Sequence, residues 1–132
     1  SGDAQKLQAL LEKYMLQSIA SIDGANEGFY HGLILGLCAI LSNRYMIRSN
    51  RESGYGRFDV MLIPREKSLP GFIYEFKFTR DESTDLNALA IDALKQINEK
   101  KYETELLDTG ITPIHKIGIA FRGKNAVVKS EL

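Results

Sequence analysis

Asp59, Glu75 and Lys77 are the residues whose types and spacing best fit a chemical role. Glu75 and Lys77 stand two residues apart in a strongly apolar segment, and Asp59 lies in a second apolar segment earlier in the chain. A charged side chain in a half-buried position lowers the stability of the fold, so such a residue is expected to serve a function. Two carboxylates close together supply the oxygen ligands that Mg²⁺ or Mn²⁺ prefers. These residues therefore indicate a metal-dependent site.

The segments that carry these residues predict a β-hairpin. Residues 57–63 and 71–79 are rich in Phe, Val, Ile and Tyr, and a compact polar connection joins them. Because side chains alternate along a strand, Glu75 and Lys77 point to one face of the second strand. The opposite face is aromatic and is made by Phe72, Tyr74, Phe76 and Phe78. The sequence thus predicts a sheet with one hydrophobic face and one face that carries charge.

The register of this hairpin decides how close the two acids come. If the connection is centred on Lys67, Asp59 lies directly across from Glu75. Cross-strand partners have Cβ atoms about 5 Å apart, where two carboxylates repel by about 3 kcal/mol at an effective dielectric of about 20. A divalent cation between them turns this repulsion into attraction. The residues alone leave one alternative open, in which Lys77 forms an ion pair with one or both acids on a solvated sheet face.

The rest of the chain predicts the elements that position this hairpin. Apolar residues at three- and four-residue steps predict helices, and apolar runs between turn residues predict strands. The expected helices cover residues 7–22, 27–42 and 86–107, and the expected further strands cover residues 45–52, 115–121 and 126–128. The order is α-α-β-β-β-α-β-β, so we expect an α/β domain in which helices cover a small mixed sheet.

The charge of the chain limits how it can bind nucleic acid. Lys plus Arg and Asp plus Glu number 17 each, so no global field attracts phosphates and any contact with them needs a local patch. Four arginines between residues 44 and 57 fit such a patch, or a solvated strand and loop, and charge alone favours neither. They are Arg44, Arg48, Arg51 and Arg57.

Length and cysteine content indicate one cytoplasmic domain. The 132 residues fit a single domain, and Cys38 as the single cysteine excludes an internal disulfide and suits a reducing compartment. The longest apolar stretch, residues 28–41, is shorter than the roughly 20 residues that a spanning helix needs, so we expect no membrane segment. Ser1 and Gly2 look like the remnant of an expression tag, so we expect a piece of a longer protein.

The chemical residues also resemble a known motif. The segment 56–59 (Gly-Arg-Phe-Asp), followed by 75–77 (Glu-Phe-Lys), resembles the bipartite motif of the PD-(D/E)XK nuclease superfamily. Glu27 at the start of the preceding helix and Gln96 on the following helix fit the accessory positions of that superfamily. Phe58 stands where the proline of the family name would be, a proline that many members lack. The resemblance is closest to the nuclease-like domain at the C-terminal end of predicted bacterial AAA-type ATPases.

The resemblance implies a fold, a domain division and a ligand set. The implied fold is an α/β restriction-endonuclease-like core with a central mixed β-sheet flanked by helices. This core would span residues 26–132, after a leading packing helix within residues 1–25. Asp59 and Glu75 would bind Mg²⁺ or Mn²⁺, with the Phe76 carbonyl as a third oxygen ligand.

The accessory residues have ordinary alternatives. The resemblance implies that Glu27 is a direct or water-bridged metal ligand, although a carboxylate in the first turn of a helix is favoured by the helix dipole in any case. Lys77 would orient the attacking water, and Gln96 would position that lysine or a phosphate. Gln96 also fits an ordinary helix surface.

These roles imply hydrolysis of phosphodiester bonds in DNA. The expected partners are DNA, an upstream AAA-type ATPase domain of the full-length protein and a second copy in a homodimer. The alternative is a catalytically silent module that keeps the nuclease fold and binds nucleic acid or protein for an attached ATPase. The zero net charge favours this alternative, whereas competent residues at every catalytic position favour the nuclease.

Overall fold

The computed structural model describes most of the chain from residue 42 onward and four earlier positions. The described residues are Gly32, Leu35, Gly36, Ala39 and residues 42–52, 57–100, 102–122 and 125–131. The elements in this part of the chain are β1 (Tyr45–Glu52), β2 (Arg57–Pro64), β3 (Gly71–Phe78), α3 (Leu86–Lys100), α4 (Tyr102–Asp108), β4 (Ile114–Arg122) and β5 (Asn125–Glu131). No helix among the described residues has the length and apolar character needed to cross a membrane.

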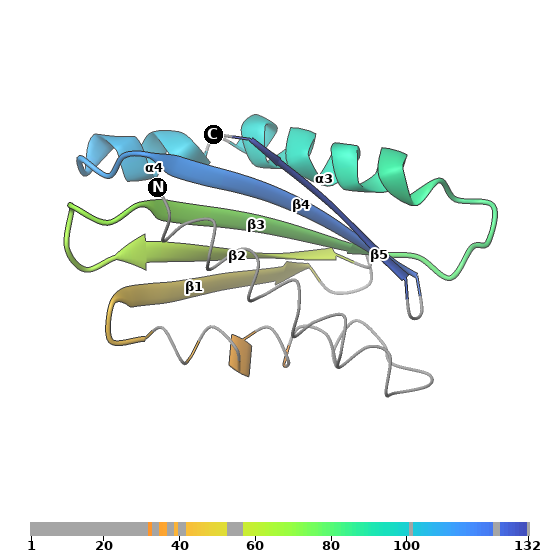
Figure 1. The fold of residues 1–132 in the computed structure, drawn as a ribbon, viewed down its shortest axis with the longest axis horizontal. Helices are drawn as coiled ribbons and strands as arrows, with labels where there is room; N and C mark the ends of the chain where they lie inside the picture. The colour runs from red at the N-terminus through yellow and green to blue at the C-terminus, as the bar shows by residue number, and fades with distance from the viewer. Residues whose placement is uncertain are drawn as a thin grey trace.

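The five strands form one mixed sheet in the order β1-β2-β3-β4-β5. Neighbouring strands are antiparallel, except for β3 and β4, which run parallel. A parallel pair needs a crossover, and α3 and α4 supply it on one face of the sheet (Figure 1). This architecture confirms the predicted α/β fold with a central mixed sheet and flanking helices.

The hairpin of β2 and β3 has the predicted register. Asp59 is the Cα partner of Glu75, and Arg57 is the partner of Lys77. Within the connection the Leu69 amide donates to the Glu66 carbonyl, and at its start the Arg65 amide donates to the carbonyl of Arg44, the residue before β1. The alternation of side chains along β3 therefore puts Glu75 and Lys77 on one face, as the sequence predicted.

Other expectations differ from the structure or lie outside it. The helix expected at 86–107 is two helices, with α3 ending at Lys100 and α4 beginning at Tyr102. The strand expected at 126–128 extends over all of β5, because its polar residues pair with β4 at the edge of the sheet. The described early positions are helical, in agreement with the helix expected at 27–42. The leading helix expected within residues 1–25 lies outside the described residues.

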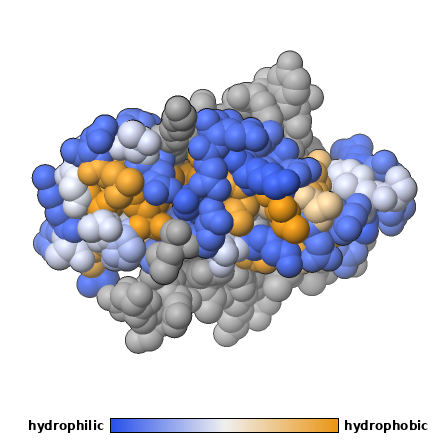
Figure 2. Space-filling view, turned by 90° about the horizontal axis from the view of Figure 1, so that it is seen from above, coloured by the Kyte–Doolittle hydropathy of each residue, from blue (hydrophilic) through white to orange (hydrophobic). Residues whose placement is uncertain are grey.

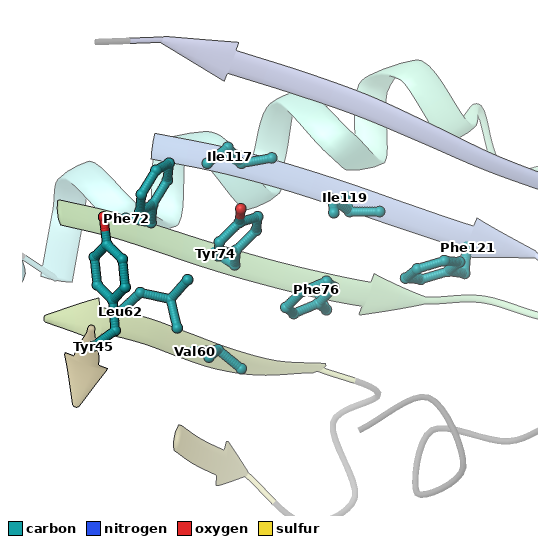
Figure 3. Packing of buried hydrophobic residues seen from close by; sticks show 9 residues of the cluster. All are labelled: Tyr45, Val60, Leu62, Phe72, Tyr74, Phe76, Ile117, Ile119 and Phe121. Atoms are coloured by element: carbon teal, nitrogen blue, oxygen red, sulfur yellow. The ribbon is translucent and has the colours of Figure 1, made fainter. Parts of the chain in front are cut away.

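The two faces of the sheet carry different cores. The face away from α3 and α4 holds the aromatic side chains of β3 in a buried cluster (Figure 3). In this cluster the rings of Tyr74 and Phe76 stack with their centroids 5.8 Å apart. Leu35 packs against this cluster. The face under α3 and α4 holds a second buried cluster made by Met61, Ile73, Ile97, Leu106, Ile111 and Ile114. Burial of both faces explains why β3 is apolar along almost its whole length.

The position of α3 depends on a glycine in β4. A Cβ atom at Gly118 would lie 2.5 Å from the Ala90 carbonyl oxygen and 2.7 Å from the Leu94 amide nitrogen. The helix backbone therefore lies directly on β4 at this residue, which is the Cα partner of Glu75. The start of α3 is fixed by Asp85, whose Oδ1 accepts a 2.9 Å hydrogen bond from the Asn87 amide. Helix α3 therefore packs over the part of the sheet that carries Asp59 and Glu75.

Candidate active site

Asp59 and Glu75 lie side by side on β2 and β3, on the face covered by α3 and α4. Asp59 is 3% exposed and Glu75 is fully buried. Ionised carboxylates are rarely buried to this degree, because removing them from water costs several kcal/mol. This burial contradicts a solvated sheet face around the two acids, whereas the alternative ion pair of Lys77 with them stays a prediction.

Lys100, the last residue of α3, lies between the two acids. Its Nζ is 3.4 Å from Glu75 Oε1 and 3.5 Å from Asp59 Oδ2. Lys100 is not among the site residues that the sequence predicts. One signal was present, since Lys100 follows the buried Ile97 by three positions and Gln96 by four, so it continues the inward stripe of the helix.

Burial dominates the electrostatics of the site. It raises the pKa of Glu75 from an ordinary 4.5 to about 7, against the opposing effect of the Lys100 ammonium group. The Asp59 charge raises this pKa further, and Lys77 lowers it by a smaller amount. The sequence indicated both a cost of burial and a mutual repulsion of the acids, and loss of water around Glu75 is the larger cause of its raised pKa. A nearby cation therefore favours the ionised form of Glu75.

The remaining candidate residues are positioned by the same elements. Lys77 is half-buried on the face of β3 that carries Glu75, because the two residues are two positions apart. Gln96 is half-buried on α3 and lies one turn before Lys100, on the same side of the helix. Its contact with a phosphate or with Lys77 stays a prediction.

The two further predicted metal ligands are the Phe76 carbonyl and Glu27. The Phe76 side chain is buried in the aromatic cluster on the opposite face, so only its backbone carbonyl is a candidate ligand. Glu27 lies outside the described residues. The roles of both residues stay predictions.

The described residues fit a divalent cation with few protein ligands. They contain no group of three or more His, Cys, Asp or Glu side chains that could hold a metal ion. Mg²⁺ is commonly bound through one or two carboxylates, with water and phosphate oxygens completing its coordination. Asp59 and Glu75 are such a pair, and the raised pKa of Glu75 indicates that added positive charge would be favourable there.

The arginines singled out in the sequence have different surroundings. Arg48 on β1 donates a 2.7 Å hydrogen bond to Glu105 of α4, and both side chains are about half exposed. This ion pair links the first strand to the helical layer. Arg44 is exposed, and the side chains of Arg51 and Arg57 lie outside the described part of the structure. Binding of phosphates by these arginines stays a prediction.

The outer surface on the side of α3 and α4 is mostly hydrophilic. Figure 2 shows this face, with hydrophobic side chains visible between the hydrophilic ones. The two helices contribute the exposed Ile91 and Leu107. The acid pair is thus buried beneath a largely polar helical layer.

A second lysine on the same side of the sheet also lies between two carboxylates. Lys116 on β4 forms an ion pair with Glu103 of α4, and its Nζ is 3.5 Å from Glu131 Oε1. It donates a 2.9 Å hydrogen bond to Asn98 of α3. Hydrogen bonding from Asn98 and the charge of Lys116 lower the pKa of Glu131. This cluster joins both helices to β4 and β5.

Comparison with known proteins gives one match. A family model described as the PD-(D/E)XK nuclease superfamily matches residues 25–131. No curated protein and no solved structure matches the chain. The family match contains all the described strands and helices, and it includes the acid pair and Lys77.

Proposed function

The chain belongs to the PD-(D/E)XK nuclease superfamily, and we propose that it is a metal-dependent nuclease that hydrolyses phosphodiester bonds in DNA. The observation that carries this proposal is the pair of buried carboxylates, Asp59 and Glu75, on adjacent strands. Replacing buried charges by apolar residues of similar volume often leaves a protein as stable or makes it more stable. A buried acid pair therefore points to a functional role.

The metal chemistry follows from the oxygen donors of the chain. Asp59 and Glu75 would hold Mg²⁺ or Mn²⁺, with the Phe76 carbonyl and Glu27 as further ligands. When bound, such a cation polarises a phosphoryl oxygen and lowers the pKa of a water molecule.

Lys77 and Gln96 carry the remaining roles. The Lys77 ammonium group orients the attacking water and favours its deprotonated form through its positive charge. Gln96 positions Lys77 or a phosphate oxygen of the substrate. Lys77 and Gln96 lie on β3 and α3, two elements that pack against each other.

The partners follow from the resemblance noted in the sequence. We propose that an AAA-type ATPase domain precedes this domain in the full-length protein, that the domain acts in the cytoplasm, and that two copies associate on DNA. The alternative is a catalytically silent module that binds nucleic acid or protein for the ATPase. It is supported by the zero net charge of the chain.

A cleavage assay separates these functions. Plasmid, linear and single-stranded DNA are incubated with the protein in Mg²⁺ or Mn²⁺, with EDTA as the metal-free control. We expect Lys77→Ala to lower the cleavage rate by about 100-fold or more, because it removes a charge that acts in the transition state. Lys95→Ala is the matched control, since Lys95 is an exposed lysine on α3.

The outcomes of this assay are distinct. Cutting that Lys95→Ala retains and Lys77→Ala loses supports the nuclease. Cutting that survives Lys77→Ala contradicts the assigned site. Metal binding without cutting of any DNA favours the silent module.

A further inference from the structure

Lys100 occupies the position where a cation shared by the two acids would be expected. Its ammonium nitrogen is almost equally distant from a Glu75 oxygen and an Asp59 oxygen, at 3.4 and 3.5 Å. The two carboxylates come from neighbouring strands, and the lysine comes from the helix above them. Three separate elements thus converge on one small volume.

A divalent cation and an ammonium group repel each other when both lie close to the same two carboxylates. Lys100 contacts one oxygen of each acid, Glu75 Oε1 and Asp59 Oδ2. A cation that binds both acids through these two oxygen atoms would therefore displace the Lys100 ammonium group.

The position of Lys100 allows it to leave. It is the last residue of α3, and its side chain is 24% exposed. A lysine has a long flexible stem, so its charged end can move into water while the helix stays in place. Lys116 offers a contrast, because its side chain is only 9% exposed.

We propose that Lys100 is a built-in counter-ion that competes with the divalent cation for Asp59 and Glu75, and so sets the cation concentration at which the site is occupied. This inference rests on the proposed function, because it concerns the same acid pair. Lys100 stabilises the metal-free protein and weakens its affinity for the cation. Substrate cleavage then becomes sensitive to the free Mg²⁺ or Mn²⁺ concentration.

Cation binding tests the competition directly. Titration of Mn²⁺ alone into wild-type protein and Lys100→Met, followed by calorimetry, gives the two dissociation constants. We expect Lys100→Met to bind Mn²⁺ about tenfold more tightly, as changes beside metal ligands commonly alter affinity by this factor or more. Lys95→Met, at an exposed position of the same helix, should bind as the wild type does, and Glu75→Gln should lose binding.

A measurement on the wild type avoids any loss of folding in the variant. The Nζ signal of Lys100, observed by nuclear magnetic resonance, should shift when Mg²⁺ alone is added, whereas the signal of Lys116 should stay in place. A Lys100 signal that does not move as Mg²⁺ binds would overturn the competition. Glu75→Gln should remove the shift.

Failure of this inference can be distinguished from failure of the proposed function. Equal or weaker Mn²⁺ binding by Lys100→Met overturns the counter-ion role but leaves the nuclease in place. Tighter binding by Lys100→Met, without cleavage of any DNA by the wild type, supports the counter-ion role and contradicts the nuclease. Absence of Mn²⁺ binding in both proteins contradicts both.

Discussion

The two lysine clusters beneath the helices contain the same kinds of group and differ in their contact with water. Lys116 lies between Glu103 and Glu131, whose side chains are 36% and 42% exposed. Lys100 lies between Asp59 and Glu75, whose side chains are 5% and 0% exposed. In each cluster a lysine lies between two carboxylates, so the comparison shows what changes when the acids are buried.

The pKa values of the acids respond in opposite directions. The pKa of Glu131 is lowered, because Asn98 and Lys116 favour its charged form and water still reaches it. The pKa of Glu75 is raised to about 7, because burial outweighs the same kind of lysine contact. The solvated acids around Lys116 stabilise the fold. Burial of Asp59 and Glu75 lowers the stability of the fold, and a functional role explains why such a pair is kept.

Gly118→Ala should disturb both clusters at once. The added Cβ would meet the backbone of α3 at Ala90 and Leu94, which cannot move as a side chain can. We expect the free energy of unfolding to fall by about 3 kcal/mol, at the upper end for overpacking. Chemical denaturation measures it. Unchanged stability would contradict the close packing of α3 against β4 at Gly118.

Glu75→Gln should stabilise the metal-free protein. The amide keeps the shape of the side chain and removes a buried charge whose pKa is about 7. Because one pKa unit corresponds to about 1.4 kcal/mol, we expect a gain of about 2 to 3 kcal/mol at pH 8. Denaturation in EDTA measures this gain. The matched change Glu131→Gln should lower stability slightly, and a loss of stability in Glu75→Gln would contradict the account.

The same residue predicts a pH dependence of stability. The folded-state pKa of Glu75 is above its ordinary 4.5, so the folded protein binds more protons than the unfolded chain between pH 4.5 and about 7. The contribution of Glu75 is therefore most favourable below pH 4.5 and is lost as the pH rises to about 7. Comparing metal-free wild type with Glu75→Gln across this range isolates it. A difference that stays constant with pH would refute the assignment.

Lys116→Met should lower stability without affecting the cation site. Removing the ammonium group leaves Glu103 and Glu131 facing each other, although water screens them. We expect a loss of about 1 to 2 kcal/mol, less than for a fully buried ion pair. Thermal unfolding measures it. Altered Mn²⁺ affinity in this variant would show that the two clusters are not independent.

Arg48→Ala should have the smallest effect. Its ion pair with Glu105 is about half exposed, and such pairs contribute little to stability. We expect a change of about 0.5 kcal/mol or less in denaturation experiments. A large loss would indicate that the link between β1 and α4 supports the acid pair.

The hairpin could be predicted because its information is local. Alternation along β3 and a connection centred near Lys67 suffice to oppose Asp59 and Glu75, and the structure has this register. The boundaries of β5 were less predictable, because its polar residues are held by backbone pairing with β4 rather than by their own burial.

Lys100 and the depth of burial could not be predicted in the same way. Both depend on how α3 lies across the sheet, which is set by the close approach at Gly118. A glycine can occur in a strand for many reasons. The close approach of the α3 backbone at Ala90 and Leu94 to Gly118 is therefore known only from the folded chain. The sequence therefore predicted which acids meet and missed the lysine that lies between them.

Mn²⁺-dependent DNA cleavage by wild type, Glu75→Gln and Glu131→Gln tests whether the buried acid pair is the active site. We expect cutting by the wild type and by Glu131→Gln, no cutting in EDTA, and no cutting by Glu75→Gln. Because Glu75→Gln is expected to be the more stable protein, its loss of activity would not reflect unfolding. Cleavage that persists in Glu75→Gln would contradict the claim that the buried acid pair is the active site.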